Sequence, residues 1–350
     1  MNLNENPHRR YNPLSGEWVK VSPHRTKRPW DGQVEDPVID DLPAHDSGCY
    51  LCPGNTRAGG HKNPDYKETF IFDNDFAALL PEQLKGDTEV NKAGGLVRAS
   101  ADRGLCRVLC FSPRHDLTLA RMSCEEIQTV VKMWTDQYEE IGSKDFINHV
   151  QIFENRGAMM GCSNPHPHGQ IWAEEAIPDL PAREINNQKA YFVKKGSQML
   201  SDYLTFELGE KERIVYQNDH FAVLVPFWAL WPFETMILPK RNISSLSEMT
   251  DHECASLAEA IRILGIKYDN LFSTSFPYSM GIHQAPTDGE EHPELTLHFH
   301  YFPPLLRSAT VKKFMVGYEL MAMAQRDITS ELSAARLREL PEVHFRDRLK

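Results

Sequence analysis

The sequence predicts an α+β fold of two tandem units, residues 1–178 and 179–350, with a mainly antiparallel sheet flanked by helices. Three observations along the 350-residue chain support this prediction. A pair of β-rich runs occurs twice, a helix start signal follows each pair, and a His-x-His segment comes later in each half. Repetition in the same order indicates one structural unit used twice.

The β-rich runs come first in each unit. Residues 74–81 (NDFAALLP) match residues 218–226 (NDHFAVLVP), and residues 107–115 match residues 234–242. Each run is rich in aliphatic and aromatic residues and reaches a proline, which predicts strands. A further short strand is predicted around Trp18 and Val19.

The helices follow capping boxes. Ser123-Cys-Glu-Glu126 and Thr250-Asp-His-Glu253 each place a glutamate three residues after a hydroxyl residue, the signature of a helix start. Apolar side chains then recur at helical spacing, which predicts one buried stripe on each helix. A charged helix is predicted after Ile328, with Thr329 as its N-cap and with Leu332, Leu337 and Leu340 on one side.

The strongest site signal is His166-Pro167-His168-Gly169-Gln170. If this segment is extended, its period of two places His166, His168 and Gln170 on one face. Two imidazoles and an amide on one face can bind a metal, attack phosphorus or donate hydrogen bonds to an oxyanion. Gly157 and Gly161 would let the backbone approach a ligand closely. The alternative, a strand with merely satisfied histidines, suits a lone histidine better than this run.

Cys49-Tyr-Leu-Cys52-Pro-Gly has the spacing of a knuckle that presents two thiolates to Zn²⁺. A redox-active pair of the thioredoxin type is the rival interpretation, but no strand–helix pattern of that type surrounds it. The chain has no second Cys-x-x-Cys, so histidines must complete the site.

The second half carries another cluster, His283, His298 and His300. Three histidines with one carboxylate would suit Fe²⁺ or Zn²⁺. Polar strand histidines at an interface are the alternative. Phe302 stands where the first half has Gln170, so this copy lacks the amide expected to face a phosphate.

Composition excludes several classes of protein. The net charge of −11 argues against nucleic acid as the main partner, and no apolar stretch approaches the length of a membrane helix. The first ten residues lack an apolar signal region, and the seven cysteines do not form a disulfide pattern. We therefore expect a cytoplasmic protein.

These residues carry a resemblance. Asn164-Pro-His-Pro-His-Gly-Gln-Ile-Trp172, preceded by Gly161-Cys-Ser163, is similar to the active-site motif of the galactose-1-phosphate uridylyltransferase family, in the histidine-triad superfamily. Further matches run from Pro7 to about Asp327. The two units are then histidine-triad-like, and Gln170 in place of a third histidine marks the transferase branch rather than the hydrolase branch.

The resemblance implies transfer of UMP from UDP-glucose to galactose 1-phosphate through a uridylyl-histidine. It implies that His168 is the nucleophile, with Gln170 and Ser163 contacting phosphate oxygens. It completes the zinc site of Cys49 and Cys52 with His115 and His166, and it adds Glu184 to His283, His298 and His300. It assigns substrate binding to Arg25, Arg28, Asn74, Asp75, Asn155, Lys313, Phe314, Tyr318, Glu319 and Gln325, and Ala58 is placed with them by its distance from the Cys49–Cys52 knuckle. It also implies a homodimer in which residues 313–325 reach the partner's active site.

Two rival functions remain. One is another histidine-triad nucleotidyl transferase or hydrolase, for example one that acts on ADP-sugars, although Gln170 disfavours hydrolysis. The other is a zinc-stabilised interaction module with inert His-x-His strands, which would form no uridylyl-enzyme from UDP-glucose.

Overall fold

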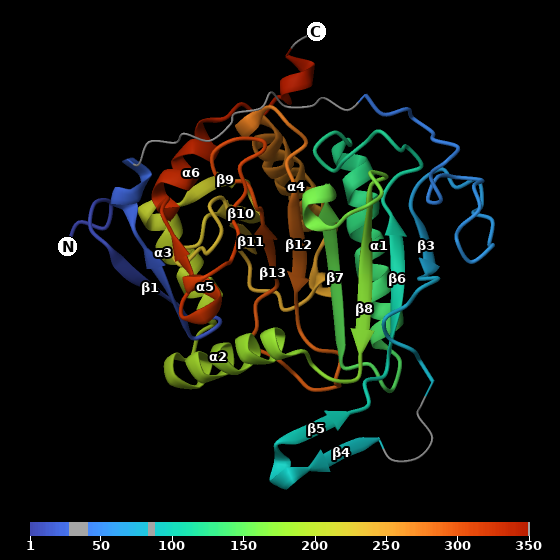
Figure 1. Ribbon diagram of the computed structural model, residues 1–350, viewed down its shortest axis with the longest axis horizontal. Helices are drawn as coiled ribbons and strands as arrows, with labels where there is room; N and C mark the ends of the chain where they lie inside the picture. The colour runs from blue at the N-terminus through green and yellow to red at the C-terminus, as the bar shows by residue number, and fades with distance from the viewer. Residues whose placement is uncertain (28–40, 83–87, 349–350) are drawn as a thin grey trace.

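The computed structural model describes residues 1–27, 41–82 and 88–348. Its centre is a nine-stranded sheet in which every pairing is antiparallel (Figure 1). In spatial order its strands are β3 (Phe70–Asp73), β6 (Gly104–Cys110), β8 (His168–Glu174), β7 (His149–Arg156), β12 (Tyr278–His283), β13 (His298–Phe302), β11 (Thr235–Pro239), β10 (Phe221–Leu224) and β9 (Ile214–Gln217). The predicted α+β class with a mainly antiparallel sheet is confirmed.

Both halves of the chain contribute to this one sheet. The junction is the pair β7–β12, where Asn155 lies opposite Ser279 and Phe153 lies opposite Gly281. The sheet therefore continues across the predicted boundary at residues 178 and 179, and the division into two units stays a prediction.

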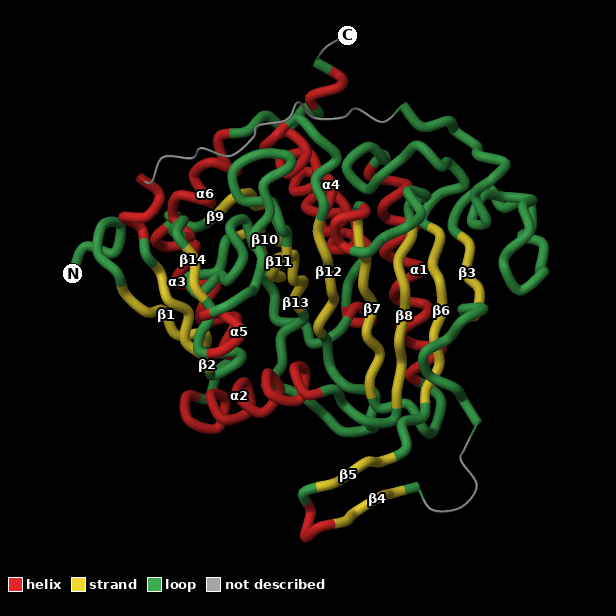
Figure 2. The backbone as a smooth tube through the Cα atoms, in the orientation of Figure 1, coloured by secondary structure: helices red, strands yellow, loops and turns green. Residues whose placement is uncertain are grey.

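Two smaller sheets lie outside the large one (Figure 2). One contains β1 (His8–Asn12), β2 (Glu17–Val21) and β14 (Gln325–Arg326). The other is a hairpin of β4 (Glu89–Lys92) and β5 (Val97–Ser100), whose residues are all exposed. The predicted strand at Trp18 and Val19 is β2.

Helices cover both faces of the large sheet. On one face, α1 (Cys124–Gly142) and α4 (Asp251–Phe272) share the main core with strand residues such as Ile152, Ile171 and Phe299. Both predicted capping boxes are present, because Ser123 accepts from the Glu126 backbone and Thr250 accepts from the Glu253 backbone.

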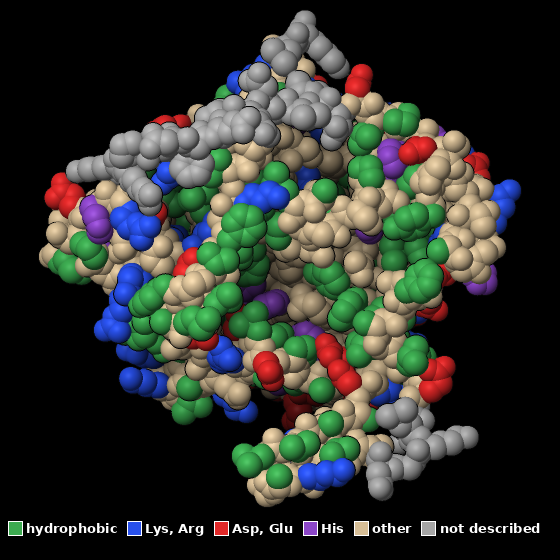
Figure 3. Space-filling view, in the orientation of Figure 1, with side chains coloured by type: hydrophobic (Ala, Val, Ile, Leu, Met, Phe, Trp, Pro, Cys, Tyr) green, Lys and Arg blue, Asp and Glu red, His purple; other side chains and the backbone are tan. Residues whose placement is uncertain are grey.

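The opposite face carries α2 (Asp179–Lys195) over the middle strands and α3 (Met199–Glu210) packed against Ala222, Leu224 and Met236. The loop with Cys49 and Cys52 packs on the same face against Val108 and Cys110. Between these covers the surface is hollowed, and histidine side chains are visible inside the hollow (Figure 3). Two short helices complete the fold, α5 (Tyr318–Met321) and α6 (Ser330–Glu339).

Several sequence predictions were wrong. Residues 74–81 form no strand, because β3 ends at Asp73, whereas the matching run contains β10. The predicted order of strands, helix and His-x-His strand also omitted one strand in each half. These strands are β7, between α1 and β8, and β12, between α4 and β13. No sequence pattern had indicated α2, α3 or the β4–β5 hairpin. Thr329 does cap α6, but Leu332 is exposed rather than part of a buried stripe.

None of the helices in the described part of the chain combines the length and the apolar character needed to cross a membrane.

Candidate functional site

The alternation of side chains along the strands places the candidate site residues on the face covered by α2. Gln170 lies opposite Phe153, Phe153 opposite Gly281, and Gly281 opposite His300. Directly paired residues point to the same face of a sheet, so Gln170 and His300 belong to one row. They are three strands apart, roughly 14 Å at about 4.8 Å per strand.

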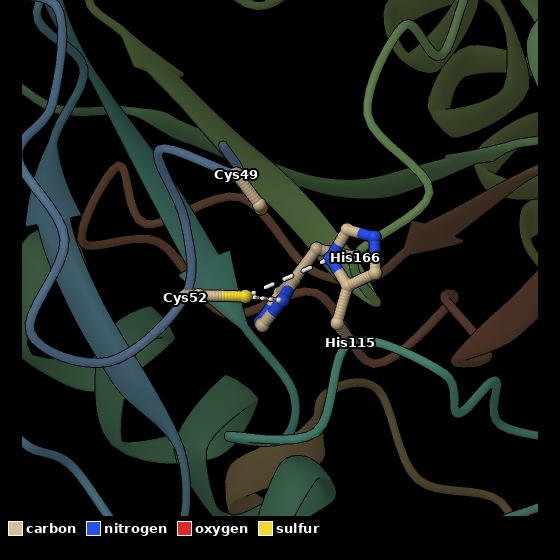
Figure 4. A group of neighbouring side chains, drawn as sticks. All are labelled: Cys49, Cys52, His115 and His166. Carbon is tan, nitrogen blue, oxygen red and sulfur yellow. Dashed lines mark hydrogen bonds between the residues drawn. The ribbon is translucent and has the colours of Figure 1, made fainter. Parts of the chain in front are cut away.

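The first cluster consists of Cys49, Cys52, His115 and His166, all buried, with one ligand atom of each within 4.8 Å of the others. The Cys52 Sγ atom lies 3.5 Å from His166 Nδ1 and 3.7 Å from His115 Nδ1 (Figure 4). A tetrahedral zinc ion, with bonds of about 2.3 Å to sulfur and about 2.0 Å to nitrogen, separates such ligands by about 3.6 Å. The four side chains therefore fit a closed metal site.

Hydrogen bonds around this cluster orient its ligands. The Tyr66 hydroxyl donates to the Leu51 carbonyl at 2.7 Å, and its oxygen lies 3.0 Å from His166 Nε2. His166 must then donate from Nε2, which leaves the lone pair on Nδ1, the atom nearest Cys52. Asn164 Nδ2 donates to Cys49 Sγ at 3.3 Å. Outer partners of this kind are typical of metal sites.

Burial disfavours the charged forms of the side chains in the first cluster. It is the main reason that the pKa of the Cys52 thiol is raised to about 11 and that the pKa of His166 is lowered to about 3. A divalent cation would reverse the first effect, because metal coordination deprotonates a thiol. The donor set of two thiols and two neutral imidazoles suits Zn²⁺.

The second cluster consists of Glu184, His283, His298 and His300. Glu184 comes from α2, and its Oε2 lies 2.6 Å from His283 Nδ1 and 3.3 Å from His298 Nε2, while Oε1 lies 3.7 Å from His300 Nε2. Burial would raise the pKa of Glu184, but the charge of His283 and hydrogen bonds to His283 and His298 hold it well below its usual value.

The second cluster also fits a metal ion. Both ring nitrogens of buried His300 lack a hydrogen-bond partner, and burial lowers the pKa of this residue to about 4. An uncharged buried imidazole without a partner is costly unless its lone pair binds a cation. Three nitrogens and a carboxylate match the donor preferences of Fe²⁺ and Zn²⁺.

His168 begins β8, two residues beyond the metal-facing His166. Its Nδ1 lies 2.7 Å from the His166 carbonyl oxygen, which can only accept, so Nδ1 carries the proton and Nε2 keeps its lone pair. Burial also lowers the pKa of His168, which favours the uncharged ring. The strand starts at His168, so the predicted common face holds for His168 and Gln170 and not for His166.

Position 169, between His168 and Gln170, has room only for glycine. A Cβ atom at this position would lie 2.8 Å from the Phe111 ring and 2.8 Å from the Phe153 carbonyl oxygen. Gly157 and Gly161, which bracket the turn before the motif, have φ of 84° and 80°, a conformation that glycine adopts without strain.

A cavity of about 430 Å³ lies at this end of β7 and β8. Its lining includes His168, Ser163 and Asn155. Asn155 accepts a hydrogen bond of 2.6 Å from the Ser279 hydroxyl, which fixes its amide at the junction of the two halves. Gln170 does not line this cavity; its Oε1 accepts from Trp172 Nε1 at 3.3 Å.

Three other predicted binding residues lie beyond the end of β3. Asp75 is 3.5 Å from the Arg57 guanidinium, and Ala58 is the next residue in that loop. The Asn74 backbone donates to Cys106, which lies opposite Trp172. Asn74 is therefore level with Trp172, which lies four residues, or about 13 Å, from His168 along β8.

Another group of predicted residues gathers on the small β1–β2–β14 sheet. Lys313 Nζ donates to Glu319 Oε1 and to the Gln325 carbonyl, both at 2.5 Å. Arg25 lies 3.4 Å from Asp327, which also accepts from the Gln325 side chain. Phe314 and Tyr318 lie in the same segment and are exposed. These residues do not line the cavity that contains His168. Arg28 lies outside the described residues.

Three contributors to the site were not predicted from the sequence. Tyr66 and Asn164 orient the first metal cluster, and His344 with the two residues after it lines the cavity. Asn164 stands inside the recognised motif and could have been noticed. Tyr66 and the C-terminal residues have no local pattern that distinguishes them.

Comparison with known proteins agrees with this arrangement. A family model described as "Galactose-1-phosphate uridyl transferase, N-terminal domain" matches residues 1–178, and the corresponding C-terminal model matches residues 184–349. The galactose-1-phosphate uridylyltransferase of Haemophilus influenzae is 52% identical over 346 residues, covering 99% of this chain and 98% of its own. The Rattus norvegicus protein of that name is 52% identical, covering 97% and 89%.

Solved structures give the same result. A structure titled "Structure of uridylyltransferase" is 26% identical, with a TM-score of 0.74 and coverage of 95% of this chain and 97% of its own. An ADP-glucose phosphorylase from Arabidopsis thaliana has a TM-score of 0.74, covers 96% of this chain and 100% of its own, and at 22% identity shares the fold. From the family models and the curated relatives, the chain belongs to the galactose-1-phosphate uridylyltransferase family.

Proposed function

We propose that this enzyme transfers the uridylyl group of UDP-glucose to galactose 1-phosphate through a covalent intermediate on His168. The observation that carries the proposal is the contact of His168 Nδ1 with the His166 carbonyl at 2.7 Å. It leaves an uncharged Nε2 lone pair on a side chain that lines a cavity of nucleotide-binding size.

In the first half-reaction, Nε2 attacks the α-phosphorus, and the bond to the bridging oxygen breaks so that glucose 1-phosphate leaves. In the second, an oxygen of galactose 1-phosphate attacks the same phosphorus, and the electron pair of the P–N bond returns to Nε2. A neutral nucleophile meets no charge repulsion from the phosphates. Gln170 and Ser163 donate hydrogen bonds to phosphoryl oxygens, which stabilises the developing charge.

Both metal clusters are assigned structural roles. Zinc held by Cys49, Cys52, His115 and His166 would fix the chain immediately before the nucleophile. Iron or zinc held by Glu184, His283, His298 and His300 would fasten α2 to the sheet, and the three strand spacings between His300 and Gln170 would keep it away from the phosphorus. A metal in either site supplies rigidity, and the chemistry stays with His168.

The proposed binding residues are assigned to different parts of the nucleotide sugar. We assign Asn155, which lines the cavity with His168, to the phosphate end of the substrate, and Asn74, Asp75 and Ala58 to the uridine end. Arg25 and Arg28 are also assigned to the uridylyl group, and Arg25, which lies beside Asp327 and does not line this cavity, belongs with the residues that a second chain would supply.

The remaining substrate-binding residues support a homodimer with shared sites. Lys313, Glu319 and Gln325 are joined to one another and do not line the His168 cavity, which supports a dimer in which they serve the cavity of the second chain. Phe314 and Tyr318 are 63% and 52% exposed, and Leu320 and Met321 beside them are 69% and 85% exposed. An exposed apolar group of this kind is typical of an interface.

The test is to incubate the protein with UDP-glucose labelled in its uridylyl group and isolate it without any acceptor. We expect label on His168, release of that label as UDP-galactose when galactose 1-phosphate is added, and parallel double-reciprocal plots. His168→Asn is the matched control and should take up no label. Intersecting plots with no labelled enzyme would mean direct transfer in a ternary complex. If an ADP-sugar labels the enzyme faster than UDP-glucose does, the group transferred would be adenylyl rather than uridylyl.

All seven cysteines are unpaired, which supports a reducing compartment such as the cytoplasm for this reaction.

A further inference from the structure

We propose that the C-terminal segment 341–347 is a wall of the His168 cavity that protects the uridylyl-enzyme from hydrolysis. The inference rests on the proposed function, because it concerns the fate of the intermediate on His168. It assigns a role to a stretch that takes no part in metal binding or in the nucleophilic attack.

Buried polar side chains near the end of α4 hold this segment in place. Asn270 donates to the carbonyls of Pro341 at 2.8 Å and Val343 at 3.0 Å, and its own oxygen accepts from the Phe345 backbone at 2.7 Å. Lys267 donates to the Leu340 carbonyl at 2.9 Å. Buried polar groups are costly without partners, so these residues favour one position of the segment.

A second connection runs from the segment to the catalytic strands. His344 Nε2 lies 3.1 Å from Asp269 Oδ2, and the same oxygen accepts from Arg156 Nη2 at 2.8 Å. Asp269 is 2% exposed and Arg156 is 6% exposed, so this pair is inside the protein. Arg156 is the last residue of β7 and follows Asn155 directly. The C-terminal segment is thus tied to the strand beside His168.

The segment and the nucleophile line one cavity. Its lining contains His344, Phe345 and Arg346 together with Ser163 and His168. Phe345 is 6% exposed and belongs to the short 3-10 helix Phe345–Asp347, at the C-terminal end marked in Figure 1. Without these side chains, the cavity would lose this part of its wall and open to water there.

Water competes with the sugar phosphate for the same bond. In hydrolysis, the water oxygen attacks phosphorus, the P–N bond breaks with its electron pair returning to Nε2, UMP leaves, and the water proton passes to solvent. No other reactant is needed, so a transferase must exclude water while the intermediate waits for its acceptor. A wall fastened by Asn270 and by the Asp269–Arg156 pair meets that need.

The test compares the lifetimes of isolated uridylyl-enzymes. His344→Leu removes the hydrogen bond to Asp269, Phe345→Ala removes the ring from the wall, and His344→Gln keeps a donor. Val343→Ala is the matched control, because Val343 lies in the same segment and is 54% exposed. We expect labelled UMP to be released roughly tenfold faster from His344→Leu, the rate change for one lost hydrogen bond of ordinary strength, and also faster from Phe345→Ala, because the missing ring admits water. His344→Gln should restore much of the lifetime, and Val343→Ala should match the unaltered enzyme.

The ratio of transfer to hydrolysis distinguishes a segment that excludes water from one that only supports the fold. Transfer to galactose 1-phosphate should continue in the variants while hydrolysis rises, whereas a general loss of structure would slow both. If the His344→Leu chain does not fold, Phe345→Ala decides the question by the same measurement. Equal lifetimes in all labelled proteins would overturn this inference and leave the proposed function standing. Absence of label on the unaltered enzyme would overturn the proposed function itself.

Discussion

At the scale of single residues, the two histidines of the His-x-His motif differ in the ring nitrogen that keeps its lone pair. Tyr66 accepts from Nε2 of His166, so Nδ1 faces the metal cluster. The carbonyl of His166 accepts from Nδ1 of His168, so Nε2 of His168 keeps the lone pair. The partners of the two imidazoles therefore select opposite tautomers, which suits the metal binding proposed for His166 and the nucleophilic attack proposed for His168.

This difference predicts distinct outcomes for the two asparagine variants. His168→Asn should lower transfer by roughly three orders of magnitude or more while zinc content and thermal stability stay unchanged, because only the attacking lone pair is lost. His166→Asn should lose zinc and about 4 kcal/mol of unfolding free energy, since it removes a ligand from a closed site. Metal analysis and calorimetry of both variants check this. Equal zinc content would mean that the two roles are reversed.

At the scale of elements, the second metal cluster joins α2 to the sheet. Glu184 is the sole ligand from α2 in that cluster, and the three histidines come from β12 and β13. His298 uses the same backbone contact as His168, donating from Nδ1 to the carbonyl two residues earlier at 2.7 Å. The same local geometry leaves Nε2 with the lone pair in both copies, toward Glu184 in the second and toward the cavity in the first.

Loss of this cluster should therefore loosen α2 more than it slows catalysis. His298→Ala should lower iron or zinc content and speed amide exchange in residues 179–195, while transfer falls by no more than about tenfold, because His300 of this cluster lies roughly three strand spacings from Gln170. Lys189→Ala, an exposed change on the same helix, is the control. Complete loss of transfer with unchanged exchange would give the metal a catalytic role.

A second connection between elements predicts acid sensitivity. Glu331 on α6 bonds to Arg10 on β1 through both carboxylate oxygens at 2.9 Å. Burial would raise the pKa of Glu331, but the hydrogen bonds and charge of Arg10 outweigh it and lower the pKa from 4.5 to about 2. The pair therefore stabilises the fold above pH 4.5, and this contribution is lost as the pH falls toward about 2.

Glu331→Gln should cost at most about 3 kcal/mol of unfolding free energy at pH 7. The difference from the unaltered protein should shrink between the two pKa values, since a protonated glutamate is as neutral as glutamine. Denaturant titrations across that pH range measure it. Glu339→Gln, at an exposed site on α6, should show no such pH dependence, and a constant difference for Glu331→Gln would contradict the assignment.

At the scale of the whole molecule, the residues proposed to bind substrate form two groups that lie apart within one chain. One group includes residues of the His168 cavity, and the other is joined to the small β1–β2–β14 sheet. In Figure 1, β1 and α5 lie at the opposite end of the molecule from β6 and β3. The proposed dimer, in which each chain completes the other's site, would bring the two groups together.

Subunit mixing tests this arrangement. His168→Asn and a double variant, Lys313→Ala with Gln325→Ala, should each be inactive alone. If sites are shared, each mixed dimer has one site with both lesions and one site with neither, so up to about half of the dimer's activity should return after exchange. Two chains that both carry His168→Asn are the control and should stay inactive. With exchange confirmed, failure to recover activity would rule out shared sites.

The sequence by itself determined the features that depend on near neighbours. Capping boxes located the starts of α1 and α4, and the Cys-x-x-Cys and His-x-His spacings located residues that the structure gathers into the two clusters. Such signals are readable because the residues that act together stand within four positions of one another.

Only the tertiary structure decided which distant residues meet. It joined strands of both halves into one sheet, placed Tyr66 against His166 a hundred positions away, brought α2 and its Glu184 over the histidines, and set the C-terminal segment beside His168. The physical reason is that these contacts depend on strand register and on packing across the whole chain. A local pattern of side chains carries no information about either.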